Sequence, residues 1–327
     1  MIQLLAKVGI NGFFFALLGM IGLAYFFPSF GTEQSPLHLP DIAEYGVSVI
    51  FFFYGLKLNP EKLKSGLSNW KLHLVIQLTT FVLFPLIILG IGEAFDVDTS
   101  SLTWLGIFYL ATLPSTVSSS VVMVAIAGGN LPAAIFNASI SSIIGIFITP
   151  LWMSRLLEKQ DANFDISSII LRLCLEVLLP VILGFLLHKK WGKWTERYNS
   201  TLRMFDQVII LLIVYTSFCE SFANNMFSNQ SFTEIMVLGL WMLLFFAVMF
   251  GIMFLVSRWL GFNRPDTITV LFCGSKKSLV QGAVMGKVLF PNPVTLGVAL
   301  LPLMIYHALQ LLAGSMIAQQ MGKEEVV

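Results

Sequence analysis

Charge is scarce in this chain, which excludes most soluble folds. Lys, Arg, Asp and Glu together make up 11% of the 327 residues, whereas they make up about a quarter of an ordinary soluble domain. Hydrophobic residues account for 57% of the chain, and the mean hydropathy is +0.84. We therefore expect an all-helical protein that crosses a membrane several times.

Cysteine and the familiar catalytic motifs are also poorly represented. The three cysteines, Cys174, Cys219 and Cys273, lack metal-ligand spacing, so neither a disulfide framework nor a zinc site is indicated. His-Glu-x-x-His, Walker and Gly-x-Ser-x-Gly motifs are absent, and the four histidines are scattered. The basic loops are short, which does not favour nucleic-acid binding. We expect no enzyme activity, no nucleic-acid partner and no cofactor apart from a sodium ion, if one binds.

Long apolar runs make up most of the chain. A membrane-spanning helix needs about 20 mostly apolar residues. Ten runs approach that length, namely 8–27, 41–57, 71–93, 102–127, 131–154, 167–188, 205–222, 233–257, 266–289 and 294–318. The first run is longer than the hydrophobic part of a signal peptide, so we interpret it as a span.

Basic residues are distributed unevenly between the two sides that ten alternating spans define. Thirteen Lys and Arg residues fall on the side of the two chain ends, and only Arg155, Lys159 and Arg172 fall on the other. Lys and Arg concentrate in cytoplasmic loops. The asymmetry predicts a multi-pass protein of the plasma membrane, which is the inner membrane in a bacterium, with both termini in the cytoplasm.

The spans divide into two groups of five, residues 1–160 and 161–327. An odd number of spans in each half gives the two halves opposite orientations. At an offset of 162 residues, Val122-Met123 aligns with Val284-Met285. We therefore predict an inverted repeat, an architecture that recurs in secondary transporters.

Two spans that the repeat superposes carry polar runs at their centres. The fourth contains Pro114 through Ser120, and the ninth contains Lys276 and Lys277 beside Gly274. A lysine at the bilayer centre costs roughly 2.5 to 3.5 kcal/mol, so we expect the pair to face a polar cavity. Neighbouring residues of a regular helix point about 100° apart, so both lysines can face one cavity only if the helix is interrupted. We predict that helices 4 and 9 are broken and cross in mid-membrane.

This pattern resembles the bile acid:sodium symporter superfamily. Ten spans, a Pro- and Ser-rich break followed by Gly129-Asn130, and a second polar break carry the resemblance. The run Cys273-Gly274-Ser275-Lys276-Lys277-Ser278-Leu279 is similar to the signature of the SBF-like branch, and the resemblance covers essentially the whole chain. It implies a panel domain of spans 1, 2, 6 and 7 and a core domain of spans 3, 4, 5, 8, 9 and 10. Movement of the core against the panel would give alternating access.

The resemblance also implies two sodium ions at the crossing, with ligands that carry over only in part. Ser120 matches the serine of the fourth span, Gln77 stands in the third, and Asn137 and Ser141 lie near the matching positions of the fifth. A sodium ion, if bound, is expected near Ser120, Asn137 and Gln77. The ninth span has no carboxylate, and Lys277 stands about where a glutamine would. An ammonium repels a nearby cation, so Lys277 could replace a sodium ion, carry a proton through the transport cycle or bind an anionic substrate.

The predicted substrate and ion site collects the polar residues of both breaks and their neighbours on other spans. Its members are Ser115, Thr116, Ser118, Ser119, Ser120, Asn137, Ser141, Gln77, Ser275, Lys276, Lys277, Ser278, Gln281, Glu176 and His307. Glu176 could be a counter-ion of a lysine, or it could pair with Arg172 on the same helix face. His307 and Gln310, three residues apart in the tenth span, could form an interhelical hydrogen bond or line the cavity.

The expected function is secondary active transport of a small organic solute, an organic anion of bile-acid-like type, coupled to sodium or protons. Two alternatives stay open. One is a non-transporting membrane regulator or receptor with the same fold, and the other is an intramembrane enzyme with a catalytic lysine. The expected partners are membrane lipid and the small solute, and the sequence does not predict an oligomeric state.

Overall fold

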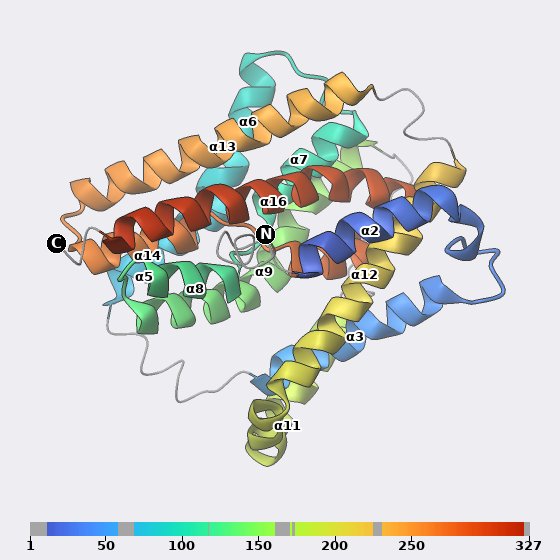
Figure 1. Ribbon diagram of the computed structural model, residues 1–327, viewed down its shortest axis with the longest axis horizontal. Helices are drawn as coiled ribbons and strands as arrows, with labels where there is room; N and C mark the ends of the chain where they lie inside the picture. Colours follow the sequence, from blue (N-terminus) through green and yellow to red (C-terminus); the bar gives the residue numbers. More distant parts are fainter. Residues whose placement is uncertain are drawn as a thin grey trace.

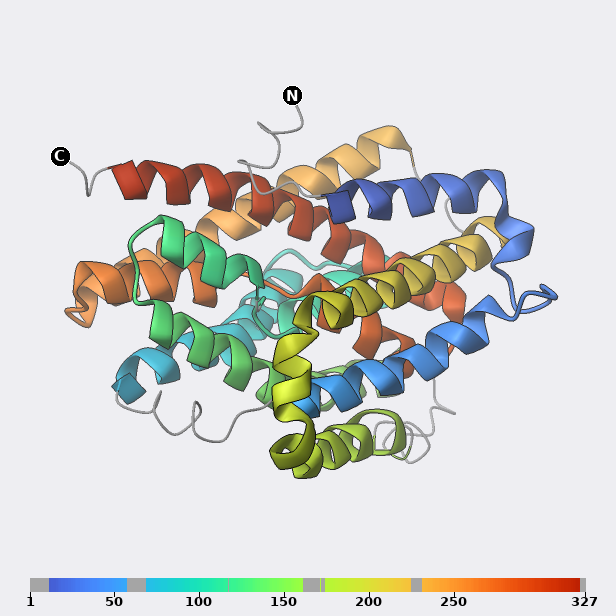
Figure 2. The same ribbon diagram turned by 60° about the horizontal axis from the view of Figure 1, so that its bottom comes forward.

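The computed structural model describes residues 12–57, 69–116, 118–160, 171, 174–224 and 231–323. Within these ranges the regular elements are all helical (Figures 1 and 2). They are α2 (Gly12–Phe26), η1 (Pro28–Phe30), α3 (Leu39–Lys57), α5 (Trp70–Leu78), η3 (Thr79–Leu83), α6 (Phe84–Ala94), α7 (Leu102–Thr112), α8 (Ser118–Ile126), α9 (Leu131–Gln160), η4 (Cys174–Leu178), α11 (Leu179–Arg197), α12 (Asn199–Ala223), α13 (Phe232–Trp259), α14 (Arg264–Gly274), α15 (Leu279–Leu289) and α16 (Pro293–Lys323).

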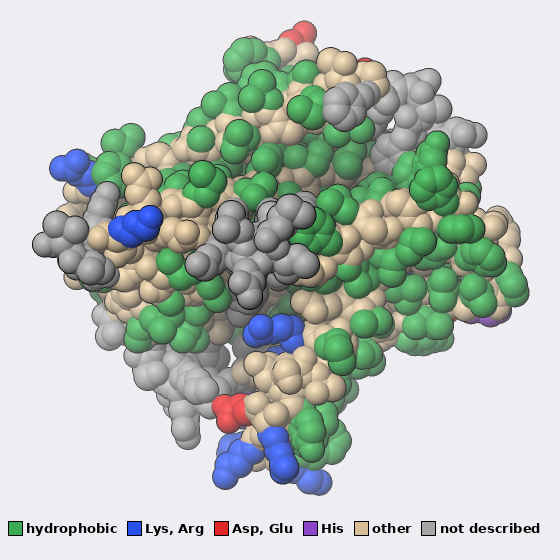
Figure 3. All heavy atoms as spheres, in the orientation of Figure 1, with side chains coloured by type: hydrophobic (Ala, Val, Ile, Leu, Met, Phe, Trp, Pro, Cys, Tyr) green, Lys and Arg blue, Asp and Glu red, His purple; other side chains and the backbone are tan. Residues whose placement is uncertain are grey.

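Six helical segments are long and apolar enough to cross a membrane. They are Leu39–Lys57, Trp70–Ala94, Leu131–Ser154, Asn199–Ala223, Thr233–Trp259 and Pro293–Lys323. Two further apolar segments, Phe15–Phe26 and Leu102–Thr112, are shorter. The segment within α13 is the least enclosed of the six, with 22% of its apolar window buried. Apolar side chains cover much of the face in Figure 3, and basic side chains gather at its lower edge over α11. Such an exterior suits contact with lipid.

The helix bounds follow most of the predicted runs to within a few residues. The runs 102–127 and 266–289 are each divided into two helices. The run 167–188 begins among residues that the structure does not describe, and its helix continues to Arg197. The extension past residue 188 contains Lys189, Lys190 and Lys193, which are good helix formers, so the polar end of the run does not end the helix.

α3 and α11 approach each other closely through two glycines. A Cβ atom at Gly55 would lie 2.1 Å from the carbonyl oxygen of Val181, and one at Gly184 would lie 2.1 Å from that of Phe52. Only residues without a side chain permit such an approach of two backbones. α2 packs along α12, which also contacts α3. Figures 1 and 2 show these four helices grouped together, while α16 packs against α7, α12, α13 and α15.

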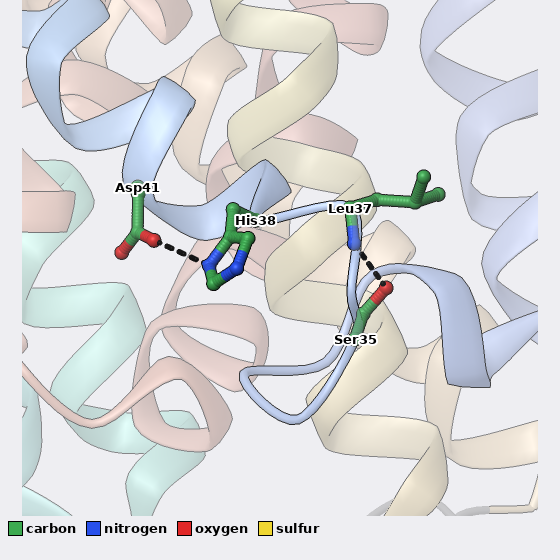
Figure 4. Close-up of polar contacts among 4 residues, drawn as sticks. All are labelled: Ser35, Leu37, His38 and Asp41. Atoms are coloured by element: carbon green, nitrogen blue, oxygen red, sulfur yellow. Dashed lines mark hydrogen bonds and ion pairs between the residues drawn. The ribbon is translucent and has the colours of Figure 1, made fainter.

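A short loop between η1 and α3 is fixed by local hydrogen bonds (Figure 4). Nδ1 of His38 lies 3.0 Å from Oδ2 of Asp41, in the first turn of α3, and the Leu37 amide donates to Oγ of Ser35 at 3.3 Å. His38 has a φ of 48°, in the left-handed region that favours turns. These contacts set the direction in which the chain enters α3.

Candidate functional site

The two predicted helix breaks are present. α7 ends at Thr112 and α8 begins at Ser118, while α14 ends at Gly274 and α15 begins at Leu279. Leu113 is extended, with φ −70° and ψ 152°, because the following residue is Pro114. The prediction that the lysine pair lies in an interrupted helix is therefore confirmed.

The two breaks contact each other through their backbones and hydroxyl groups. The Ser278 amide donates to the Pro114 carbonyl at 2.9 Å. Oγ of Ser115 donates to the Cys273 carbonyl at 2.6 Å, and Oγ of Ser120 donates to the Phe272 carbonyl at 3.0 Å. The last carbonyls of a helix have no donor within the helix. Serines of the first break therefore satisfy the C-terminal end of α14.

Lys277 satisfies the corresponding end of α7. Its Nζ donates to the carbonyls of Thr80 at 2.7 Å, Ala111 at 2.7 Å and Leu113 at 2.8 Å. The face of the Phe84 ring lies beside it, with the ring centroid 4.0 Å from Nζ. A positive group is favourable here because the C-terminal end of a helix carries a partial negative charge and aromatic faces attract cations.

Two of these carbonyls, those of Thr80 and Ala111, are free because of local features of the sequence. In the π-helical turn η3, the Phe84 amide donates to Thr79, and Pro85, one residue later, has no N–H with which to bond Thr80 in the same way. At the end of α7, the Ser115 amide, which would close the helical bond to Ala111, donates to Oγ of Ser141 at 3.0 Å instead. The Lys277 ammonium therefore donates hydrogen bonds to carbonyl oxygens that have no backbone donor.

Two side chains of α16 hold the backbone of the second break. Oε1 of Gln310 accepts from the Lys277 amide, and Nε2 of Gln310 donates to the Lys277 carbonyl, both at 2.8 Å. Oη of Tyr306 donates to the Ser275 carbonyl at 2.7 Å. Oγ of Ser275 itself donates to Leu271 at 2.6 Å. The side chains of α16 thus replace helical partners that the interruption removes.

Lys276 points elsewhere. Its Nζ contacts Sδ of Met123 and the Ser119 carbonyl, the latter at 3.4 Å, and it lies 5.4 Å from the Phe272 ring centroid. Both lysines are fully buried, and among the described residues neither forms an ion pair with a carboxylate. The expectation that both face a polar cavity is wrong, because the interruption sends the two side chains into different parts of the interior.

A polar cavity does lie next to the breaks. It has a volume of about 290 Å³ and is enclosed by α2, α3, α12, α16, the first break and the start of α15. Its polar lining consists of Tyr54, Lys57, Thr116, Ser119, Asn199, Arg203, Asp206, Gln207, Ser278 and His307. Four of the predicted site residues, Thr116, Ser119, Ser278 and His307, are therefore brought together here.

Sequence reasoning missed the charged residues of this cavity. Nζ of Lys57 lies 3.4 Å from Oδ2 of Asp206, and Oδ1 of Asp206 is buried with no hydrogen-bond partner among the described residues. Arg203 lies one turn earlier on α12. The basic residues at 57 and 203 were assigned to cytoplasmic loops by their position at the ends of apolar runs. A carboxylate within the predicted span 205–222 was the signal that could have located the site.

The proposed sodium ligands are only partly assembled. Nε2 of Gln77 donates to Oδ1 of Asn137 at 3.2 Å, and Nδ2 of Asn137 lies 2.8 Å from Nδ1 of His73. Ser120 instead contacts Thr116 at 2.6 Å, and no hydrogen bond joins it to Gln77 or Asn137 within the described part of the chain.

The other predicted site residues have varied surroundings. Nδ1 of His307 lies 2.8 Å from Nε2 of Gln310, one turn away on the same helix α16, and His307 also lines the cavity. The hydrogen bonds that leave α16 are those of Gln310 to the Lys277 backbone. Gln281 is buried, and its Oε1 has no partner among the described residues. Glu176 belongs to η4 and is not among the residues that line the cavity. The Ser118 side chain and all of Arg172 lie outside the described residues.

Two broken helices that meet beside a polar cavity, within a bundle of long apolar helices, define a multi-pass membrane protein of the kind that handles solutes. The chain belongs to the SBF-like CPA transporter family, whose model matches residues 11–323. It is 33% identical over 325 residues to sodium/bile acid cotransporter 7 of Rattus norvegicus, with 96% of this chain and 93% of the relative covered. It is 34% identical over 317 residues to the protein YfeH of Escherichia coli, with coverage of 96% and 94%. It is thus a membrane transporter by family, and not an enzyme.

Proposed function

We propose that the protein is a secondary active transporter that moves a small organic anion by alternating access. The anion binds in the cavity between the helix breaks and α2, α3 and α12. The observation that carries this proposal is the placement of two helix N-termini at the cavity wall, since α8 begins at Ser118 and α15 at Leu279, and Ser119 and Ser278 line the cavity. Free N–H groups and a partial positive charge make such helix ends favourable for anions.

The charged residues of the cavity lining also favour an anionic substrate. Lys57, Arg203 and Asp206 provide two cationic groups and one carboxylate. The carboxylate pairs with Lys57, which leaves the guanidinium of Arg203 for the substrate. A planar guanidinium binds a carboxylate or sulfonate through two parallel hydrogen bonds. A singly charged organic acid matches this lining best.

The volume of the cavity favours a compact substrate. About 290 Å³ lies at the small end of ligand sites, which span roughly 300 to 1,000 Å³. A bile-acid-like anion is the finer form of the proposal, and its support is the name of the rat relative. A panel of anions of increasing size distinguishes these two forms.

The proposal includes an architecture that can open the cavity to either side. It has ten spans in two inverted repeats, 1–160 and 161–327, a panel formed by spans 1, 2, 6 and 7, and a core formed by the other six spans. The packing of α2, α3, α11 and α12 together, with the cavity between them and the breaks, supports this division. The distribution of basic residues supports cytoplasmic termini in a plasma or bacterial inner membrane.

Coupling to a cation, either sodium or a proton, completes the proposal. Gln77 and Asn137 are the described residues that support a sodium ion on the first half of the chain. Oε1 of Gln77 is buried with no hydrogen-bond partner among the described residues, and Nε2 of the same side chain lies 3.2 Å from Oδ1 of the buried Asn137. Sodium prefers such oxygen ligands to nitrogen ligands, as hard cations do in general.

Uptake into proteoliposomes tests the function. The purified chain would be reconstituted, and initial uptake of labelled carboxylates, sulfonates and a bile acid would be measured under a sodium gradient, a proton gradient or neither. We expect saturable uptake of one anion class that falls at least tenfold in Arg203→Gln. Arg258→Gln is the matched control, because Arg258 is exposed at the end of α13 and does not line the cavity. Saturable binding without flux would identify a receptor or regulator, and absence of both would contradict the proposal.

A further inference from the structure

Three backbone carbonyl oxygens converge on one buried point beside the helix breaks, and the Lys277 ammonium occupies that point. We propose that this is a site for a monovalent cation in which the Lys277 ammonium takes the place of a metal ion, so that transport needs no sodium ion at the breaks. The inference rests on the proposed transport function and deepens it, because it identifies what supplies the positive charge at the crossing.

The ligands around the ammonium are those of an alkali-cation site. Backbone carbonyls replace the hydration shell of a monovalent ion in selective pores, and here those of Thr80, Ala111 and Leu113 lie 2.7 to 2.8 Å from Nζ. The end of α7 and the face of the Phe84 ring, at 4.0 Å, add negative potential. No formal negative charge is needed, because a single positive charge is balanced by these dipoles.

A further oxygen is available at the same place. Thr80 is fully buried, and its Oγ1 has no hydrogen-bond partner among the described residues. A metal ion that replaced the ammonium would thus have a hydroxyl oxygen on the same residue as one of its carbonyl ligands. The chemistry of the donors, three carbonyls and a hydroxyl, is that of a hard cation.

The ammonium is tethered in a way that prevents exchange with ions in solution. Lys277 is fully buried, and Gln310 holds its amide and its carbonyl, each at 2.8 Å. Withdrawal of the ammonium would require the break itself to move and would leave three carbonyls without donors. The amino group that fills the site is therefore a built-in part of the protein and is not loaded from solution and released in each cycle.

Lys276 provides the matched comparison. It is also fully buried and differs from Lys277 by one position. Its Nζ, however, has one carbonyl contact, at 3.4 Å, and a contact with the sulfur of Met123. Its removal vacates no ring of oxygen atoms, so it should create no site for a metal ion.

The experiment measures thermal unfolding of the purified full chain in NaCl, KCl and choline chloride at equal ionic strength. Any sodium-specific rise in the wild type is assigned to the separate pair Gln77 and Asn137, so each variant is compared with the wild type in the same salt. In Lys277→Ala, the vacated site can take sodium or potassium, so the midpoint should be lower in choline and rise by at least about 3 °C in one of the metal salts. Lys276→Ala should show no cation-specific rise.

Two results would overturn the inference. One is a Lys277→Ala midpoint that rises no more than the wild-type midpoint between choline and the metal salts, and the other is an equal cation-specific rise in Lys276→Ala. If Lys277→Ala does not fold in choline, rescue of folding by NaCl or KCl supports the inference, and failure to fold in all three salts contradicts it. A failure of the proposed transport function would appear separately, as absence of anion uptake into proteoliposomes. The thermal measurements would still test the cation site at Lys277.

Discussion

Gln310 and Lys277 are joined by two hydrogen bonds that run in opposite directions, one into and one out of the same side-chain amide. Lys277 lies between α14 and α15, where the backbone has no helical partners. A side chain from α16 thus supplies the donor and the acceptor that neighbouring turns of a continuous helix would supply. The arrangement explains how an interrupted backbone is tolerated in a water-poor interior.

Gln310→Leu should lower stability, because the Lys277 amide and carbonyl would both be buried without a partner. We expect a loss of about 2 kcal/mol in the free energy of unfolding, measured by denaturation in detergent. Gln320→Leu, at an exposed position of the same helix, is the control and should have little effect. An equal loss in both variants would show that the paired hydrogen bonds contribute nothing specific.

Lys277→Met should destabilise the protein more than Lys276→Met. Methionine keeps an apolar stem of similar length, so the comparison isolates the ammonium. Three carbonyls lose their donor in the first variant, with an expected cost of about 3 kcal/mol. The second variant loses one long carbonyl contact and a contact with the Met123 sulfur, with a cost of about 1 kcal/mol or less. The thermal midpoints of the two variants in the same detergent provide the test, and the reverse order would contradict the assignment.

Gly55→Ala should disrupt the contact between α3 and α11. The added methyl group would lie 2.1 Å from a backbone oxygen of α11, which cannot move without the whole helix. We expect a loss of about 1 to 3 kcal/mol, as for other overpacked interiors. Gly90→Ala in α6 meets no atom within 4 Å and should be neutral or slightly stabilising, since alanine favours helices. Thermal unfolding of both variants distinguishes a specific steric effect from a general loss of glycine.

Asp206→Asn should increase the affinity for the transported anion. The substitution removes the carboxylate from the described cavity lining and leaves Lys57 without its ion-pair partner. Loss of a like charge near a bound anion favours binding by about 1 kcal/mol, which corresponds to a Kd or KM about fivefold lower. Uptake kinetics measure this value, with Asp98→Asn in the α6–α7 loop as the control. An unchanged or higher KM would place the anion elsewhere.

Local features of the sequence predict the breaks but not their partners. Pro114 restricts the residue before it, and Gly274 with its serines weakens the helix, so both interruptions could be placed without a structure. The acceptors of Lys277 could not, because they lie 164 to 197 residues away along the chain. The missing N–H of Pro85 is visible in the sequence, yet only the π-helical turn makes Thr80 the residue whose carbonyl is released.

The charged part of the candidate site was hidden for a different reason. Lys57 and Arg203 stand at the ends of apolar runs, where basic residues usually mark the cytoplasmic side. Only packing of α3 against α12 brings them to one cavity with Asp206. The rule that uses Lys and Arg to find the cytoplasmic side therefore does not reveal which of these residues also line a binding site near that side.

The carbonyl contacts of Lys277 also restrict how the molecule can change shape. One ammonium ties η3 and α7 to the second break, although these parts are more than 160 residues apart in the chain. Separating them would expose several unpaired polar atoms at once, so they behave as a single rigid body. This body can move against α2, α3 and α12 at the lowest cost in broken contacts, because the cavity already interrupts the packing between them. The hinge of the transport cycle is therefore expected at the boundary between this body and those helices, and the Lys277 ammonium holds together the rigid body on one side of it.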